Sequence, residues 1–517
     1  MSWEPEVEEL ERRRELARRM GGPENVERQR KAGRLTVRER VRELLDAGSL
    51  RETGSLADKA TYADGKIESF LPANSVLGTG RIDGRRVVVC GDDFTVRGGA
   101  GDAAIHAKQV YGERMARELR MPIVRLVDGT GGGGSVKTYE VTGRTYVPGN
   151  PGWDHIVAML SEVPVIAAAL GPVAGLGAAR VAHSHFSLMV RGVSQVFVAG
   201  PPVVARAFGS PVGKEELGGV DIHGKNGTVD NVVDSEAEAF EQIRRFLGYL
   251  PASVWQLPPR ATPTDDAQRR DEALLSIIPR NRRRGYDPRV LVAHVVDRDS
   301  FFELGRTWGG SLLTALARLD GYPVGVVASD PMQAGGALTA DGSDKLARFA
   351  DLCDTFHLPV VHFVDQPGFL IGIPAERAST IRHGVRALAA VYQATVPWVS
   401  IIVRRVFGVA GAGHGNVQAL NLRYAWPSGD WGSLPLEGGI EAAYKRELEA
   451  APDRAALMRD IEARLNAVRS PFRAAEVFNI EEIIDPRDTR PLLTDWVSLA
   501  YQLEATRLGP KTRGARP

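Results

Sequence analysis

The sequence predicts an α/β protein built from two related domains. One observation is internal repetition: with the chain shifted by 237 positions, residues 81–128 match residues 318–365 at 15 of 48 positions, whereas average composition would give roughly three matches. A second is that short apolar runs alternate with amphipathic segments, as in parallel sheets covered by helices. A third is that glycine-rich turns follow the apolar runs in both halves.

The repeated positions include charged residues and glycines as well as apolar residues. Because such positions are not all set by core packing, we infer two copies of one fold and two related half-sites. The matched residues are Arg81, Asp83, Gly84, Val87, Val89, Asp93, Gly98, Gly99, Ala100, Ala103, Lys108, Pro122, Val124, Val127 and Asp128, which fall on Arg318, Asp320, Gly321, Val324, Val326, Asp330, Gly335, Gly336, Ala337, Ala340, Lys345, Pro359, Val361, Val364 and Asp365.

The first fifty residues are expected to form charged helices. Thr36 and Glu39 have the spacing of a capping box, and Gly48 fits the end of that helix. The arginines of this region could form an anion or partner site. A solvated helix face packed on the body is the simpler interpretation.

Buried strands and intervening helices are expected in the same order in both halves. Between the halves, residues 257–273 are rich in proline, threonine and charge, which indicates a linker. We therefore divide the chain into a first domain at 1–256, a linker at 257–285 and a second domain at 286–517. The expected strands are 87–90, 123–127, 163–170, 324–328, 360–364 and 399–403; the expected helices are 101–119, 342–356 and a last helical segment at 437–468.

Composition narrows the class of protein. The 65 basic and 64 acidic residues balance, so the overall charge gives no reason to expect binding to nucleic acid or to an anionic membrane. Cys90 and Cys353 lie in or beside apolar segments, which indicates buried thiols in a reducing compartment. No run of about 18 apolar residues and no apolar signal region occurs. We expect a cytoplasmic protein that does not span a membrane.

The glycine-rich turns are the candidate functional elements. They lie at 128–134 and 171–177 in the first half and at 365–372 and 407–415 in the second. Glycine lets the backbone approach a ligand, and a helix that starts at such a turn offers free N–H groups to negative charge. A pair of such amides forms an oxyanion hole. One such turn alone would be interpreted as a tight strand–helix connection, but four turns paired across a duplication favour function.

Other motifs are absent or ambiguous. The sequence has no dinucleotide-binding fingerprint in a βαβ unit, P-loop, G-x-S-x-G elbow, H-E-x-x-H motif or Cys/His metal spacing, so no metal site is expected. Asp128 and Asp365, which are duplicated at strand ends, either cap the following turn or orient a loop or ligand. His383 and His414 could contact substrate, although a lone histidine is more often structural.

Several longer segments resemble a known family. They are GRLTVRERVRELLD, GRIDGRRVVVCGDDFTVRGGA, LGPVAGLGAARVAH, EELGGVDIHGKNGTVD, LDGYPVGVVASDPMQAGGAL, DKLARFADLCDTFHLPVVHFVDQPGF, IRHGVRALAAVYQATVPWVSIIVRR and YAWPSGDWG. Together they make the chain, from about residue 27 to 505, similar to the carboxyltransferase (β) subunits of biotin-dependent acyl-CoA carboxylases, such as the propionyl-CoA and methylcrotonoyl-CoA enzymes.

The resemblance implies two tandem crotonase-superfamily (ClpP/crotonase-like) domains and a homohexamer built as a dimer of trimers, with the active site between domains of two subunits. It implies transfer of a carboxyl group from carboxybiotin to the α carbon, or the vinylogous γ carbon, of an acyl-CoA through a thioester enolate. The chain lacks a Met-Lys-Met biotinylation site. Biotin is therefore expected on a partner α subunit with biotin carboxylase and biotin carrier domains, where ATP and Mg also act.

The resemblance also assigns site residues. The hole for the CoA thioester oxygen maps to the amides around Gly175, Leu176 and Gly177, and the hole for the biotin ureido oxygen maps to Val409 and Ala410. Residues expected to line the substrate site are Gly131, Gly132, Gly368, Phe369, Gly411, Ala412 and His414. The small Ala412 would leave room for a longer or substituted acyl group.

The chain departs from the family pattern at these loops. The usual Ser-Gly-Gly-Ala-Arg is replaced by residues 129–133, which lack arginine, and Leu176 and Val409 stand where glycine is usual. A backbone amide survives such replacements if its φ remains allowed. Two alternatives therefore stay open: a biotin-independent acyl-CoA decarboxylase, and a non-catalytic scaffold paralogue in a carboxylase complex.

Overall fold

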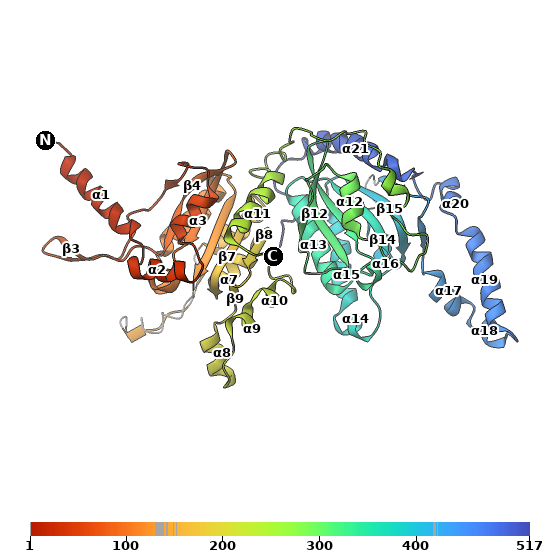
Figure 1. The fold of residues 1–517 in the computed structure, drawn as a ribbon, viewed down its shortest axis with the longest axis horizontal. Coiled ribbons are helices and arrows are strands. Elements are labelled where there is room, and N and C mark those ends of the chain that lie inside the picture. Colours follow the sequence, from red (N-terminus) through yellow and green to blue (C-terminus); the bar gives the residue numbers. More distant parts are fainter. Residues whose placement is uncertain are drawn as a thin grey trace. The chain divides into compact units, whose positions relative to one another are not determined.

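The computed structural model describes residues 2–129, 139–140, 143–147, 149–150, 152–416, 420 and 422–516. The chain divides into two compact units, one formed by Met1–Gln256 with Gly509–Pro517 and the other by Leu257–Leu508. Each unit contains one eight-stranded sheet with helices packed on it (Figure 1). The prediction of two related α/β domains is confirmed.

The first unit begins with three helices, and its last helix is α11. Its sheet strands are β1 (Arg51–Glu52), β4 (Ser75–Ile82), β5 (Arg85–Asp92), β6 (Ile123–Gly129), β7 (Val165–Ala174), β8 (Phe186–Val190), β9 (Gln195–Phe197) and β10 (Asn231–Val233), and a separate hairpin is formed by β2 (Thr61–Ala63) and β3 (Lys66–Ser69). Its helices are α1 (Glu4–Arg18), α2 (Pro23–Lys31), α3 (Val37–Leu44), α4 (His106–Glu118), α6 (Trp153–Met159), α7 (Leu176–Ala182), α8 (Pro201–Phe208), α9 (Lys214–Gly218), α10 (Val220–His223) and α11 (Glu236–Tyr249).

The second unit repeats this order and adds a helical extension before its last helix. Its strands are β11 (Phe302–Leu304), β12 (Leu312–Leu319), β13 (Tyr322–Ser329), β14 (Val360–Gln366), β15 (Trp398–Phe407), β16 (Leu422–Ala425), β17 (Asp430–Gly432) and β18 (Glu482–Ile483). Its helices are α12 (Pro288–Val295), α13 (Ala340–Thr355), α14 (Ile373–Arg377), α15 (Thr380–Gln393), α16 (Gly408–Ala412), α17 (Leu436–Ala443), α18 (Lys445–Ala450), α19 (Arg454–Val468), α20 (Pro471–Glu476) and α21 (Thr489–Glu504).

The two sheets have the same topology. The strand order is β1-β4-β5-β6-β7-β8-β10 in one and β11-β12-β13-β14-β15-β16-β18 in the other, with β9 paired to β7 and β17 paired to β15. In both, an antiparallel hairpin leads into parallel central strands. Of these, β6 and β14 are buried at every position, which explains why they appear in the sequence as nearly continuous apolar runs.

Contacts are duplicated along with topology. The hairpin turn has left-handed backbone at Asp83 (φ 48°) and again at Asp320 (φ 49°). A buried lysine ammonium in each unit donates to a strand carbonyl over 2.8 Å: Lys108 Nζ to Ser75 O, and Lys345 Nζ to Leu312 O. Repetition of these unusual conformations and buried charges explains why non-apolar residues survived in the sequence repeat.

Helix boundaries follow local sequence rules. Thr36 and Glu39 form the expected capping box at the start of α3, and the helix ends at Leu44, before Gly48. The single helical segment expected at 437–468 is instead three helices, α17, α18 and α19. Asp453 caps α19 by accepting from the Ala456 N–H over 2.9 Å, which starts a new helix within the segment.

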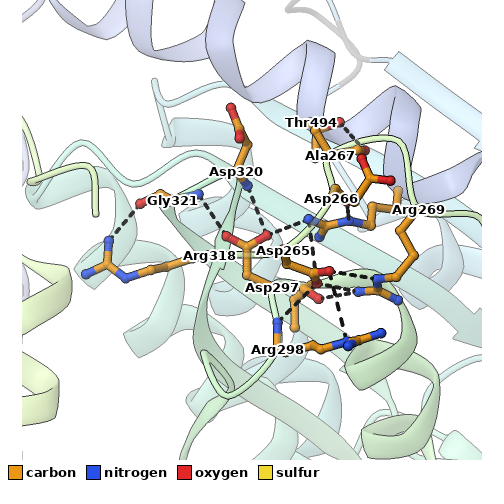
Figure 2. Close-up of polar contacts among 12 residues, drawn as sticks. Asp265, Asp266, Ala267, Arg269, Asp297, Arg298, Arg318, Asp320, Gly321 and Thr494 are labelled. Carbon is orange, nitrogen blue, oxygen red and sulfur yellow. Dashed lines mark hydrogen bonds and ion pairs between the residues drawn. The ribbon is translucent and has the colours of Figure 1, made fainter. Parts of the chain in front are cut away.

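Residues expected to form a linker are part of the second unit. Arg490, on α21, donates to the Asp266 carbonyl and to Asp297 Oδ1, both over 2.8 Å. Arg269 binds Asp265 over 2.8 Å, and Asp297 also accepts from the N–H groups of the β12–β13 turn. Figure 2 shows Arg269 bound to Asp265, and Asp297 bound to the N–H groups of the turn. Tertiary ion pairs therefore order a segment whose composition alone indicates a linker.

The C-terminal residues also differ from the expected boundary. Residues 509–517, which we assigned to the second domain, belong to the first unit. The Gly509 N–H donates to the Val254 carbonyl over 2.8 Å. Among the helices described here, none has the length and apolar character needed to cross a membrane.

Arg490→Met should lower the free energy of unfolding of the second unit by about 3–5 kcal/mol, because it leaves the buried Asp297 without its cation. Denaturant unfolding of the full chain measures this change. Arg487→Met is the matched control, since Arg487 lies just before α21 and its ion pairs are much less buried than that of Arg490. It should change the unfolding midpoint far less than Arg490→Met. Equal effects of the two substitutions would contradict a structural role for the Arg490 network.

Candidate active site

The candidate site is built on an irregularity that both sheets share. Between β6 and β7 the pairing passes from Val127–Ala169 to Gly129–Val173. Between β14 and β15 it passes from Val364–Ile402 to Gln366–Val406. In both cases one residue on the first strand, Asp128 or Asp365, lies opposite three on the next. This bulge directs the end of the longer strand into the loop that holds the predicted hole.

A buried aspartate occupies each bulge and is neutralised by two arginines. Asp128 is bound by Arg40 over 2.8 Å and by Arg34 over 3.4 Å. Asp365 is bound by Arg404 over 2.7 Å and by Arg405 over 2.6 Å. Both aspartate side chains have no exposed surface. Both aspartates therefore anchor the bulge through ion pairs.

The two aspartates have different electrostatic environments. Burial raises the pKa of Asp128 above its ordinary value, and the charges of Arg40 and Arg34 offset this only in part. Burial also acts to raise the pKa of Asp365, but hydrogen bonds and charges from Arg405 and Arg404 outweigh it and lower the pKa. The difference follows from the contacts, because both Asp365 oxygens accept short hydrogen bonds from guanidinium groups.

In the first unit, Gly175 joins β7 to α7 with left-handed backbone, at φ 61° and ψ −122°. Its own N–H donates to the Phe197 carbonyl over 3.2 Å and is therefore already used. The N–H groups of Leu176 and Gly177 stand in the first turn of α7, where no intrahelical acceptor exists. Leu176 is 37% exposed, so this turn reaches the surface of the unit. Of the three predicted residues, Leu176 and Gly177 can donate to a ligand.

The second unit repeats this arrangement. Gly408 has φ 61°, the same value as Gly175, and it starts α16 directly after β15. Val409 and Ala410 follow in the first turn, and Val409 is 59% exposed while Ala410 is buried. In both loops the residue with positive φ is the glycine before the substituted position, Gly175 or Gly408. Leu176 and Val409 can therefore replace the usual glycine without disturbing the start of the helix.

The other predicted residues of the second loop differ in burial: one is exposed and two are buried. Ala412 is exposed, whereas Gly411 is buried where an added Cβ would lie 2.9 Å from the Val406 carbonyl carbon. His414 is 5% exposed, and its Nδ1 lies 2.6 Å from the Gly411 carbonyl oxygen. Burial lowers the pKa of His414, which favours the neutral ring. His414 thus supports the loop from inside, and His383 is paired with Asp344 at 2.8 Å.

Gly368 and Phe369 lie in the turn that follows β14. Gly368 has φ 126°, and its carbonyl accepts from the Leu338 N–H over 2.9 Å. The Phe369 ring packs on α15, where a Cβ on Gly384 would lie 2.3 Å from a ring carbon. The corresponding residues of the first unit, Gly131 and Gly132, lie outside the described residues.

Sequence reasoning missed the arginines. Arg40 is completely buried; besides Asp128 it contacts Glu236 over 2.8 Å and the Leu170 carbonyl over 2.6 Å. The sequence did not single it out because the same helix also carries Arg38, which is half-buried, and Arg42, which is exposed. Arg404 and Arg405 were visible as a charged pair at the end of an apolar run, a position that indicates a buried partner.

The chemistry available here is binding of negative charge by backbone amides. Each fixed donor to a developing oxyanion is worth roughly 3 kcal/mol of barrier. Within the described ranges, no group of three or more His, Cys, Asp or Glu side chains could hold a metal ion. Two equivalent loops of this kind suit a reaction in which charge develops on two oxygens.

Comparison with known proteins identifies the family. The carboxyl transferase domain family matches residues 28–514. The chain belongs to this family. A propionyl-CoA carboxylase carboxyltransferase subunit from Haloferax mediterranei is 34% identical over 501 residues, which cover 95% of each chain. A methylmalonyl-CoA decarboxylase subunit alpha from Veillonella parvula is 31% identical, with 96% of each chain covered.

Solved structures agree with this assignment to the carboxyl transferase family. The transcarboxylase 12S hexamer, solved with methylmalonyl-coenzyme A and methylmalonic acid bound, matches with a TM-score of 0.86 and 30% identity. The match covers 100% of this chain and 98% of that chain. The fold expected from the resemblance, two tandem crotonase-like domains, is thereby confirmed.

Gly175→Ala should lower carboxyl-transfer activity about tenfold, because an L-residue at this left-handed position is strained by roughly 1–2 kcal/mol and the loop relaxes away from its conformation. An added methyl would meet nothing within 4 Å, so the effect comes from the backbone alone. Gly248→Ala is the control. An added methyl there also meets nothing within 4 Å, but Gly248 lies within α11 and has an ordinary φ, so activity should be unchanged. Activity is measured on the best acyl-CoA of a panel. Wild-type activity of Gly175→Ala would refute the idea that the left-handed backbone at Gly175 holds the loop in its active conformation.

Proposed function

We propose that the chain is the carboxyltransferase subunit of a biotin-dependent acyl-CoA carboxylase, moving a carboxyl group between biotin and an acyl-CoA. The observation that supports this most is the duplicated loop, in which Gly175 and Gly408 take the same φ of 61° and each precedes a helical first turn. Membership of the carboxyl transferase domain family supports the same reaction.

The first-unit loop is proposed to hold the acyl-CoA thioester. The N–H groups of Leu176 and Gly177 would bind the thioester oxygen, and they would bind it more strongly once the α-proton leaves and the oxygen becomes an enolate oxyanion. Such preferential binding of the charged state lowers the barrier. Fixed backbone dipoles need no reorganisation when the charge appears, which suits a site with no catalytic acid or base assigned from this chain.

The second-unit loop fits biotin. A ureido oxygen needs hydrogen-bond donors, and the first turn of α16 supplies the N–H groups of Val409 and Ala410 without an intrahelical acceptor. The exposed Val409 and Ala412 side chains border this turn. Biotin supplies the carboxyl group that is transferred. Val409 and Ala410 would hold its oxygen, and the buried His414 would keep the turn in place through Gly411.

The partners follow from this assignment. We propose that biotin arrives on an α subunit with biotin carboxylase and biotin carrier domains, which also uses ATP and Mg. We also propose a homohexamer, because the transcarboxylase 12S relative is described as a hexamer. Location in the cytoplasm is consistent with Cys90 and Cys353, both of which are free thiols.

Decarboxylation is a second candidate. A relative at 31% identity is named as a methylmalonyl-CoA decarboxylase subunit, and loss of a carboxyl group also passes through a thioester enolate, which the Leu176 loop would stabilise equally well. The deciding experiment incubates the chain with an acyl-CoA panel and with a biotinylated partner, and measures carboxylation and decarboxylation separately. Turnover without biotin would refute the carboxylase assignment.

Leu176→Pro and Val409→Pro should each reduce kcat by about 100-fold or more, because proline removes one hole N–H while being tolerated in the first turn of a helix. The changes in KM should be small, since the lost interaction is strongest in the transition state. Leu176→Ala and Val409→Ala are the controls, because they shorten the side chains and keep the amides. Steady-state kinetics should show a loss confined to the proline variants; equal losses in the alanine variants would place the contribution in the side chains.

Ala412→Ile should shift acyl-chain preference toward shorter acyl groups, because the family resemblance places the residue just beyond the biotin loop beside the acyl chain. Ala412 is exposed there, and a larger side chain would fill that space. The measurement is kcat/KM over acetyl-, propionyl-, butyryl- and longer acyl-CoAs. Ala455→Ile, an equal enlargement at an exposed site on α19, is the control. An unchanged profile for Ala412→Ile would place the acyl chain elsewhere.

A further inference from the structure

A cavity of about 480 Å³ lies in the second unit, away from the glycine loops. Its walls come from the segment before α12, the end of β15, the turn after β16 and the junction between α19 and α20. The volume is in the range of pockets that enclose small ligands, about 300–1,000 Å³. None of Val409, Ala410, Ala412 and His414 lines it.

Four arginines line the cavity, and no carboxylate is among its described lining residues. They are Arg280, Arg282, Arg404 and Arg469. Apolar wall is provided by residues such as Leu275 and Ile278. A cavity with cationic and apolar walls and no acidic group favours an anion that carries an apolar or aromatic body.

Two of these guanidinium groups are already occupied. Arg404 donates to Asp365 through Nε and Nη2 and to the Arg284 carbonyl through Nη1. Arg469 donates to Asp430 through Nε and Nη2 and to Asn466 through Nη1. Each of these two guanidinium groups therefore uses three of its five N–H donors within the protein, and both form rigid wall.

The other two guanidinium groups retain free donors. Arg282 uses Nη1 for Asp430, at 2.8 Å, which leaves Nε and Nη2. Arg280 is exposed, and its side chain makes no hydrogen bond or ion pair with the residues that the structure describes. Both extend from one short loop that also carries Arg283 and Arg284. These free donors stand beside the wall that Arg404 and Arg469 form.

We propose that this cavity is a binding site for a phosphorylated small molecule with an apolar or aromatic body, of the nucleoside diphosphate class. The planar guanidinium forks of Arg280 and Arg282 match phosphate oxygens in bidentate geometry. The side of the cavity around Leu275 and Ile278 accommodates the base. This proposal does not depend on the carboxyl-transfer assignment, since its free donors belong to Arg280 and Arg282, which take no part in the candidate active site, and since it is tested by binding alone.

Isothermal titration of the full-length protein with ADP, and separately with inorganic pyrophosphate, tests the site at 150 mM salt. Arg280→Ser should weaken ADP binding at least tenfold, since charge-assisted hydrogen bonds are removed. Arg283→Ser is the matched control: it also removes an exposed charge from the same loop, but Arg283 lies outside the cavity lining. It should change the affinity less than twofold.

A second variant tests the apolar wall. Leu275 is 53% exposed, so Leu275→Asp is compatible with folding, and it replaces apolar wall that would contact the base with a carboxylate, without removing any arginine. It should weaken ADP binding by tenfold or more. Tighter binding of ADP than of pyrophosphate would support a site for the base. Equal weakening by Arg280→Ser and Arg283→Ser would show diffuse charge attraction, and absence of ADP binding at millimolar concentration would show that no such site exists. Either result would overturn the proposal.

Discussion

The structure depends on one interaction that occurs twice: a buried aspartate at a sheet bulge, held by two arginines. A carboxylate without solvent is costly unless it is paired, and Asp128 and Asp365 have no exposed side-chain surface. Their pairing fixes the point at which the central strand leaves the regular sheet. The loops that carry the proposed oxyanion donors start within a few residues of that point, so their position follows from the ion pairs.

The two units reach this arrangement by different routes. In the second unit, Arg404 and Arg405 come from β15 itself, opposite the aspartate. In the first, β7 has Gly171 and Pro172 in the corresponding place, and the cations come from Arg34 and Arg40 at the start of the chain. A Cβ on Gly171 would lie 2.1 Å from Asp128 Oδ1, so glycine makes room for this rearrangement. Duplicated folds can therefore preserve a charge pattern while exchanging the residues that provide it.

The duplicated loops also explain how glycine can be replaced in them. Strain is confined to Gly175 and Gly408, which have left-handed φ, while the donors that follow have helical conformations open to any L-residue. Leu176 and Val409 are compatible with the same backbone and change the surface beside it. A family can thus alter the shape of such a site without losing the amides on which the proposed chemistry depends.

The sequence by itself determined the duplication, the order of strands and helices, the α3 capping box and the two glycine loops, because each of these depends on local periodicity or on the steric demands of single residues. Only the tertiary structure decided which arginines neutralise Asp128 and Asp365. It also decided that the Gly175 N–H donates within the protein, and that residues 265–269 are bound to α21. Those outcomes depend on contacts between distant positions, such as Arg40 with Asp128 and Arg490 with Asp297. A charged residue looks the same in sequence whether it is solvated or buried against a partner, so folding alone distinguishes the two.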